Sequence, residues 1–258
     1  DLVGKSAEYT LEDIKSEPGD TFSATQVRND IFTITDKFSD EGYAYANVVP
    51  NTSINKKEKT VDLDFASTKG NIVKINKISV SGNEKTYDNV IRRTLKIEEQ
   101  QLYSGTKIKR SQTLLQRLGY FDEVSITNQP TGDPSVVDLD VHVKEATTGS
   151  FSAGAGYSTN NGAIFNTKVS ENSLFGTGRR VNLNVDVGSQ VSSQVLSLDD
   201  PRINDSSFSG GIDLMRTYRV FDDFNRQLSG GAVSVGYPGD KILGDWAEDL
   251  ILNTKYEL

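Results

Sequence analysis

The stretches SVSGNEKTYDNVIRRTL (residues 79–95) and RLGYFDEVSI (residues 117–126) decide the fold of this chain. In the first, a Gly-Asn turn separates an alternating strand from a segment whose apolar residues have helical spacing. In the second, Gly119 ends a helix, and Tyr120 and Phe121 lead into a strand. Glycine permits a left-handed helix cap, and aromatic rings fill the join between helix and sheet. The order strand, helix, helix, strand, strand is therefore expected here.

An incomplete copy of this pattern precedes it. Helices are expected at residues 7–16 and 25–43, where Gly42 ends the second, and strands at residues 45–49 and 60–65. Gly42 and Gly119 occupy matching places about 77 residues apart, which indicates an internal repeat. The full copy is expected to have its elements at residues 73–83, 87–95, 106–120, 121–127 and 136–144.

The spacing of apolar residues changes after Thr147. Alternating segments of about ten residues replace helical spacing and are separated by Gly, Asn, Asp and Pro. Apolar residues on one face and small or polar residues on the other are typical of an outer-membrane barrel, and equally of a soluble sheet with one wet face. The expected strands are residues 149–157, 163–172, 180–188, 192–200, 207–215, 228–237 and 247–258.

Composition excludes several classes of protein. No stretch approaches the roughly 18–20 continuous apolar residues of a membrane helix. The absence of cysteine excludes disulfides and thiolate chemistry, and a net charge of −8 with no local basic patch makes nucleic acid an unsuitable partner. The first residues do not resemble a signal peptide and the chain ends within an alternating run, so both ends are expected to be cut.

No catalytic, metal or cofactor site is expected. His142, the only histidine, alternates with valines and is expected to be an exposed strand residue. Asp199-Asp200 and Asp222-Asp223 are expected in turns, where aspartate bonds to the backbone. Gly154-Ala-Gly156 lacks the third glycine and the helix of a nucleotide-binding loop. We therefore expect that the protein is not an enzyme.

The quoted motifs resemble those of two linked architectures. Residues 79–95 and 117–126 resemble a POTRA domain, and TGSFSAGAGYSTNNGAIF (148–165), ENSLFGTGRRVNLNV (171–185) and SLDDPRI (197–203) resemble BamA-type outer-membrane assembly factors. The resemblance covers nearly the whole chain. It implies α+β POTRA modules (β-α-α-β-β) followed by an antiparallel transmembrane β-barrel, incomplete in this chain. The implied domains are a POTRA domain lacking its first strand (1–70), a POTRA domain (71–146) and about seven barrel strands (147–258).

The resemblance also implies a function. It is the assembly and insertion of β-barrel proteins into the bacterial outer membrane, with the POTRA domains in the periplasm and without a cofactor. The implied partners are unfolded outer-membrane proteins, periplasmic lipoproteins of an assembly complex and the lipid bilayer. Two alternatives stay open: a POTRA-barrel secretion transporter of the two-partner type, and a soluble periplasmic scaffold.

Three sets of site residues follow from these expectations. Arg92 and Glu99 are the candidates for binding a periplasmic partner, because they lie off the expected buried side of their helix. The expected edge of the second POTRA sheet, suited to pairing with a client strand, contains Phe121, Val124, Ser125 and Ile126. The first barrel strand is expected to form one side of a lateral gate, since its glycines weaken pairing; its residues are Phe151, Ser152, Gly154, Gly156 and Tyr157.

Overall fold

The computed structural model describes residues 14–159, 162–244, 247 and 250–258. The chain forms two compact units, and each combines segments that are distant in the sequence. The first unit comprises Asp1–Ser81, Leu95–Leu114 and Val124–His142; the second comprises Gly82–Thr94, Leu115–Glu123 and Val143–Leu258.

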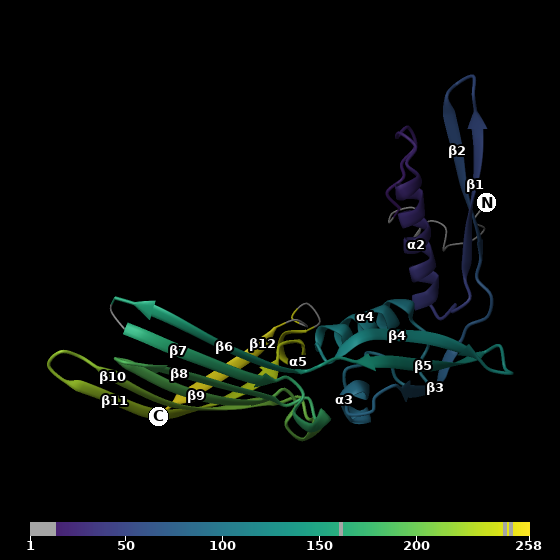
Figure 1. Cartoon of the computed structure of the whole chain (residues 1–258). Coiled ribbons are helices and arrows are strands. Elements are labelled where there is room, and N and C mark those ends of the chain that lie inside the picture. The colour runs from purple at the N-terminus through teal and green to yellow at the C-terminus, as the bar shows by residue number, and fades with distance from the viewer. Residues whose placement is uncertain (1–13, 160–161, 245–246, 248–249) are drawn as a thin grey trace. The chain divides into compact units, whose positions relative to one another are not determined.

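The first unit begins with a helix packed on a hairpin (Figure 1). Helix α2 (Ala24–Asp40) starts where the Ser23 hydroxyl accepts a hydrogen bond from the Gln26 N–H, so a side chain satisfies one free donor of the first turn. Strands β1 (Asn47–Asn55) and β2 (Thr60–Thr68) pair antiparallel. Their common core is formed by the buried side chains of Ile34, Phe38 and Val48.

The end of α2 caps the start of helix α4 (Gly105–Arg117). The Ser104 hydroxyl donates to Asp40 Oδ1 at 2.6 Å, and the Gly105 N–H donates to Ser39 Oγ at 2.8 Å. A helix N-terminus has free N–H groups and favours a nearby carboxylate. The polar ends of the two helices therefore satisfy each other.

A three-stranded sheet has the order β3-β5-β4, formed by β3 (Lys74–Ser81), β5 (Val136–Glu145) and β4 (Phe121–Pro130). Strands β3 and β5 run parallel, and parallel strands need a long crossover connection, which the segment with the two helices provides. Strand β4 lies at an edge, as the sequence predicts.

Helix α3 (Asp88–Arg92) is much shorter than the helix expected at residues 87–95. The Thr94 hydroxyl donates to the Val90 carbonyl, the acceptor that the next helical N–H would use. The Thr94 N–H bonds instead to the Ile91 carbonyl, three residues back, so the last turn tightens and the helix ends.

The second unit contains one antiparallel seven-stranded sheet with strands in sequence order (Figure 1). It is open, and β6 and β12 are its end strands. All seven expected strands are present, with shifted ends. Their bounds are β6 (Gly149–Ser158), β7 (Gly162–Glu171), β8 (Arg180–Gly188), β9 (Val191–Asp200), β10 (Ser209–Val220), β11 (Asn225–Pro238) and β12 (Ile251–Glu257).

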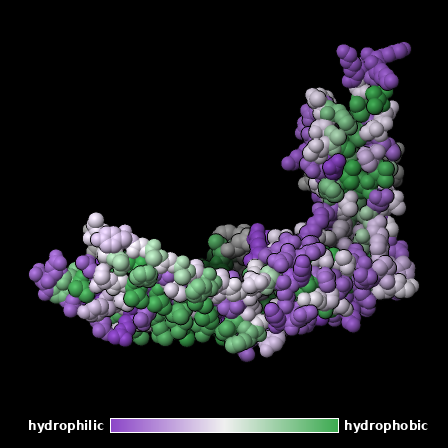
Figure 2. All heavy atoms as spheres, viewed as in Figure 1, coloured by the Kyte–Doolittle hydropathy of each residue, from purple (hydrophilic) through white to green (hydrophobic). Residues whose placement is uncertain are grey.

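The register gives this sheet one apolar and one polar face. One row across β8 to β11 is Val181, Leu198, Ile212 and Val233; the adjacent row is Asn182, Ser197, Asp213 and Ala232. Neighbouring residues of a strand point to opposite faces, so the first row lies on the apolar face and the second on the polar face. Apolar residues gather along the middle of the sheet (Figure 2). This confirms the alternation expected from the sequence.

Short elements join the strands. A 3-10 turn at Leu174–Gly176 joins β7 to β8, another at Ile203–Asp205 joins β9 to β10, and α5 (Asp240–Leu243) follows β11. The helix expected at residues 7–16 lies mostly outside the described residues, and the described part, residues 14–16, is not helical. Among the described helices, none is both long and apolar enough to cross a membrane.

Candidate functional site

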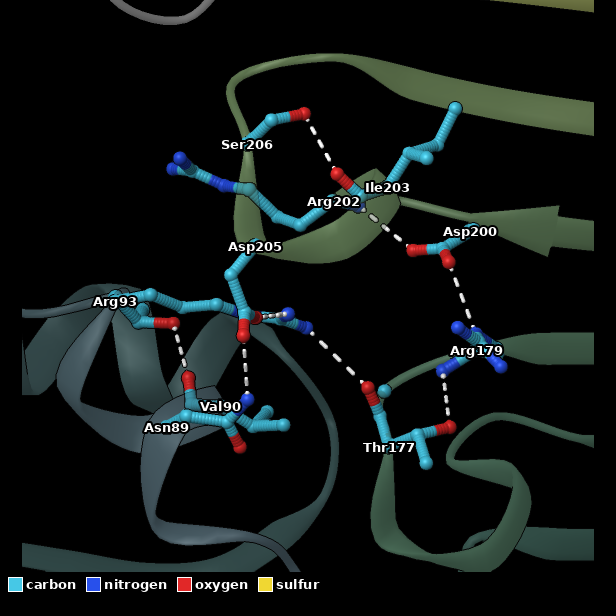
Figure 3. A network of polar contacts seen from close by, with 12 residues as sticks. Asn89, Val90, Arg93, Thr177, Arg179, Asp200, Arg202, Ile203, Asp205 and Ser206 are labelled. Atoms are coloured by element: carbon cyan, nitrogen blue, oxygen red, sulfur yellow. Dashed lines mark hydrogen bonds and ion pairs between the residues drawn. The ribbon is translucent and has the colours of Figure 1, made fainter.

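A polar network in the second unit joins helix α3 to the two 3-10 turns of the sheet (Figure 3). Arg93 Nη1 donates to Asp205 Oδ1 at 2.5 Å, and Asn89 Nδ2 donates to Asp205 Oδ2 at 2.7 Å. Arg93 Nη2 reaches the Thr177 carbonyl at 3.3 Å. One arginine therefore bridges the β7–β8 turn and the β9–β10 turn.

Asp205 is held in its charged form. Hydrogen bonds from the Asn89 amide and the Arg93 guanidinium keep the pKa of the Asp205 carboxyl below its ordinary value. Asn204 and Asp205 both have positive φ, 52° and 58°, a conformation that short polar side chains tolerate better than others. The turn is thereby shaped to aim the carboxylate at α3.

The β7–β8 turn packs closely against the segment before α3. A Cβ atom on Gly176 would lie 1.9 Å from the Lys85 carbonyl oxygen, and the Gly176 carbonyl accepts a hydrogen bond from the Tyr87 N–H at 3.0 Å. Gly176 also has a φ of +74°. Only glycine satisfies both the conformation and the close approach.

The second glycine of the turn, Gly178, receives a hydrogen bond from a buried side chain. Tyr120 is 1% exposed, and its hydroxyl donates to the Gly178 carbonyl at 3.1 Å. The ring of Tyr120 fills the expected join after Gly119, and its hydroxyl tethers the turn.

Glu145 fixes the other end of the same segment. Its carboxylate accepts hydrogen bonds from the Lys85 N–H at 3.0 Å and from the Thr86 N–H at 2.6 Å. Burial raises the pKa of Glu145, but the hydrogen bonds from Thr86 and Lys85 outweigh it, so the pKa is below its ordinary value. The segment that contacts Gly176 is thus held by a charged carboxylate.

The expectation that Asp199 and Asp200 lie in a turn is wrong, because both end strand β9. Asp200 still serves the turn that follows: it accepts the Arg202 N–H at 3.0 Å and pairs with Arg179 Nε at 2.9 Å. The carboxylate therefore ties the β9–β10 turn to the end of the β7–β8 turn. Asp222 and Asp223 lie in the bend between β10 and β11, as expected.

The residues expected to form the gate lie on β6, the first strand of the seven-stranded sheet. Its neighbour in the sheet is β7, and every residue of β6 is exposed. Phe151 and Tyr157, 71% and 80% exposed, lie on the apolar face, whereas Ser152, Gly154 and Gly156 lie on the other. A Cβ on Gly154 would meet Asn166 Oδ1 at 2.4 Å, while Gly156 has open space.

The expected strand-pairing residues lie on the edge strand β4. Phe121 and Val124 are buried, and Ser125 and Ile126 are half-buried. The Val124 carbonyl already accepts a hydrogen bond from Gln112 Nε2 at 2.8 Å. A side chain of α4 therefore occupies one acceptor of this strand.

Arg92 and Glu99, the expected partner-binding residues, are both exposed and both have contacts within their own unit. Arg92 Nε lies 2.5 Å from Asp88 Oδ2 on the same helix. Glu99 Oε1 accepts the Ile78 N–H at 2.9 Å.

The sequence did not single out Asn89, Arg93, Asp205 or Glu145. The motifs ENSLFGTG and SLDDPRI marked both turns, but a turn motif does not reveal which segment packs against it. His142 is exposed on its strand, as expected. In the described part of the chain, no group of three or more histidine or acidic side chains is placed to hold a metal ion.

Comparisons with known proteins agree on one family. The model of the POTRA family, "Surface antigen variable number repeat", matches residues 5–70 and 73–146. The outer membrane protein assembly factor BamA of Nitratidesulfovibrio vulgaris is 32% identical over 249 residues, covering 96% of this chain and 31% of the relative. BamA of Neisseria meningitidis is 32% identical over 199 residues, covering 77% of this chain and 25% of the relative. The chain thus spans a third or less of these relatives.

The fold is also that of a solved relative. The crystal structure of BamA from Haemophilus ducreyi lacking POTRA domains 1-3 matches with a TM-score of 0.79 at 22% identity, covering 92% of this chain and 46% of that one. At this identity the match concerns the fold.

Proposed function

We propose, from the premise that this chain belongs to the POTRA family and is of the BamA type, that it serves to assemble and insert β-barrel proteins into the bacterial outer membrane. In this proposal residues 1–70 and 71–146 are periplasmic POTRA domains, and residues 147–258 are barrel strands. The partners are unfolded outer-membrane proteins, lipoproteins of an assembly complex and the bilayer. The process makes and exchanges hydrogen bonds and needs no cofactor.

The observation that carries the proposal is the two-faced antiparallel sheet, whose first strand, β6, has apolar side chains on one face and little side-chain bulk on the other. A client strand entering the membrane has N–H and C=O groups that hydrocarbon cannot satisfy. An available sheet edge pairs with them and lowers the barrier to insertion. Among the described strands β6 pairs with β7, and Ser152, Gly154 and Gly156 give its polar face little side-chain bulk to hold a second neighbour, so we propose that its other edge opens to clients.

Strand β4 is proposed as an earlier docking edge for clients in the periplasm. Because Gln112 occupies the Val124 carbonyl, a client would pair with this strand beyond that point or displace the glutamine. Ile126 lies two residues on, so its N–H points to the same side as the Val124 carbonyl. Ile126→Pro removes this donor, and Ile126→Val keeps it. We expect weaker client binding for the proline variant alone, with circular dichroism confirming that both fold.

A lipoprotein partner is proposed to bind near Arg92 and Glu99. Both are exposed, and neither belongs to the core of its unit. Arg92 is in an exposed ion pair, which stabilises folding by only about 0–1 kcal/mol, so Arg92→Glu should leave the protein folded. Glu99 accepts the Ile78 N–H, so the variant there is Glu99→Gln, which removes the charge and keeps an acceptor. We expect reduced capture of the lipoprotein by each variant. Unchanged capture would place the partner elsewhere.

The network around Arg93 is proposed to transmit client docking to the barrel. It connects α3 with the turns that begin β8 and β10, so a shift of the helix moves the ends of two strands. The direct test of the function places the purified intact protein in lipid vesicles and follows protease-resistant insertion of an unfolded client. We expect faster insertion than in empty vesicles; equal rates would contradict the proposal.

A further inference from the structure

A polar row interrupts the apolar face of the seven-stranded sheet. Leu196 and Leu214 pair across β9 and β10 on this face, and both are exposed. Two residues further toward the β10–β11 hairpin, the same face carries Gln194, Arg216 and Ser229 in register on three strands. All three are exposed, so the leucines of β9 and β10 give way to a row of hydrogen-bond donors that continues on β11, whereas β8 continues with Val185.

The next row on this face has the same character. Ser192, Tyr218 and Gln227 are in register on the same three strands. Each side chain in the two rows carries an N–H or O–H donor, and neither row contains a carboxylate. The resulting patch, which we call the donor patch, therefore favours an anion.

Arg216 is the only charged member of the donor patch. In the part of the chain that the structure describes, no ion pair links it to a carboxylate. An arginine on a lipid-facing strand is costly at the middle of a bilayer but not near its surface. The position of Arg216 across the membrane therefore matters.

The spacing along β10 places Arg216 at the boundary of the apolar band. At the opposite end of the strand, Phe208 packs against Tyr237 with ring centroids 4.8 Å apart, as in an aromatic girdle. Eight residues separate Phe208 from Arg216, about 27 Å along a strand and about 20 Å across a bilayer at the usual tilt. An apolar band is about 25 Å tall, so Arg216 lies near the headgroups of the far leaflet.

We propose that the donor patch binds the phosphorylated headgroup of an anionic lipid, whose acyl chains lie along Leu196 and Leu214. The occupant must match both a cationic donor row and the apolar surface next to it, and a lipid with an anionic phosphate does so. This inference rests on the proposed placement of the sheet in a membrane.

The position of the donor patch within the sheet excludes strand pairing as its binding mode. Strands β9, β10 and β11 each pair with a neighbour on both sides, so their backbone edges are occupied. Only the side chains on their face are available. A client strand pairing at an edge uses β6 or β4 instead.

A fluorescent label next to the donor patch tests the proposal in the intact protein. The chain has no cysteine, so Val187→Cys provides a labelling position on the same face, beside Ser192 and outside the donor patch. Quenching of the label by brominated phosphatidylglycerol and by brominated phosphatidylcholine in vesicles gives the relative affinity of the two lipids. One basic residue near a membrane surface contributes a preference on the order of fivefold for the anionic lipid.

Three variants test whether Arg216 causes the preference for the anionic lipid. We expect Arg216→Gln to bring the ratio close to one, Arg216→Lys to keep most of the preference, and Arg219→Gln, on the opposite face of β10, to leave it unchanged. Equal quenching by both lipids in the parent protein, or a preference that survives Arg216→Gln, would overturn the proposal. Absence of quenching by either lipid would do so as well, because a protein would then cover the donor patch.

Client insertion measured in the same vesicles separates the two proposals. If the client is inserted but the label shows no preference for the anionic lipid, only the proposed headgroup site is wrong. Absence of insertion in every vesicle defeats the proposed function.

Discussion

Arg93 Nη1 lies 2.5 Å from Asp205 Oδ1, and the two residues come from α3 and from the β9–β10 turn, 112 positions apart in the sequence. The Arg93 side chain is 14% exposed and that of Asp205 is 49% exposed. A largely covered cation thus depends on a carboxylate at the surface, with the Thr177 carbonyl as its other acceptor. Through these two bonds Arg93 attaches α3 to both the β7–β8 turn and the β9–β10 turn.

Arg93→Ala should release the β9–β10 turn from α3. The variant removes the Arg93 bonds to Asp205 and Thr177 together, so the Asn89–Asp205 hydrogen bond is the remaining polar contact between α3 and the β9–β10 turn. We expect severalfold faster amide hydrogen exchange at residues 203–208 in the intact protein. Arg92→Ala is the matched control, since Arg92 pairs with Asp88 on its own helix. Equal exchange in both variants would show that the bridge does not hold the turn.

Gly176→Ala and Gly119→Ala separate conformational strain from close packing. The two glycines have nearly the same φ, +74° and +72°, but a Cβ would meet the Lys85 carbonyl at Gly176 and open space at Gly119. A left-handed conformation costs a non-glycine residue about 1–2 kcal/mol, which is the loss of unfolding free energy expected at Gly119. We expect a clearly larger loss at Gly176, measured by denaturant unfolding. Equal losses would mean that the turn does not press on Lys85.

Acid should weaken the hydrogen bonds that Asp205 makes with α3 and that Glu145 makes with Lys85 and Thr86. The pKa values of Asp205 and Glu145 are below their ordinary range in the folded protein, so each contributes stability that is fully present above its unfolded pKa, about 4. This stability is lost as the pH falls from there through the lowered folded pKa. Hydrogen exchange at residues 203–208 should therefore rise below about pH 4 relative to its intrinsic rate. Asp205→Asn should show a smaller pH dependence, and an unchanged profile would exclude Asp205 as the cause.

The repeat, the seven strands and their two faces were predictable from the sequence because local rules determine them. Alternation fixes which face of β8 is apolar, and Gly119 needs its left-handed conformation whatever surrounds it. The length of α3 was not predictable in this way. Its end depends on the competition of one hydroxyl, that of Thr94, for a backbone carbonyl.

The packing of the β7–β8 turn against earlier parts of the chain was only partly predictable. Gly176 and Gly178 stood out as turn residues, but their second role follows from the approach of Lys85 and Tyr120, more than 50 residues earlier in the chain. Likewise, Arg92 and Arg93 are adjacent arginines that the sequence alone does not distinguish. Only the three-dimensional structure separates the exposed one, which pairs within its helix, from the covered one, which bridges two turns.

The most direct test is a disulfide lock on the edge of β6 that does not pair with β7. In the intact protein, a cysteine replacing Ser152 is oxidised to a cysteine on the final barrel strand, and insertion of an unfolded client into vesicles is followed before and after reduction. If the β6 edge admits clients, oxidation should stop insertion and reduction should restore it, while the single cysteine Ser152→Cys stays active throughout. Insertion at full rate with the lock closed would contradict the central claim.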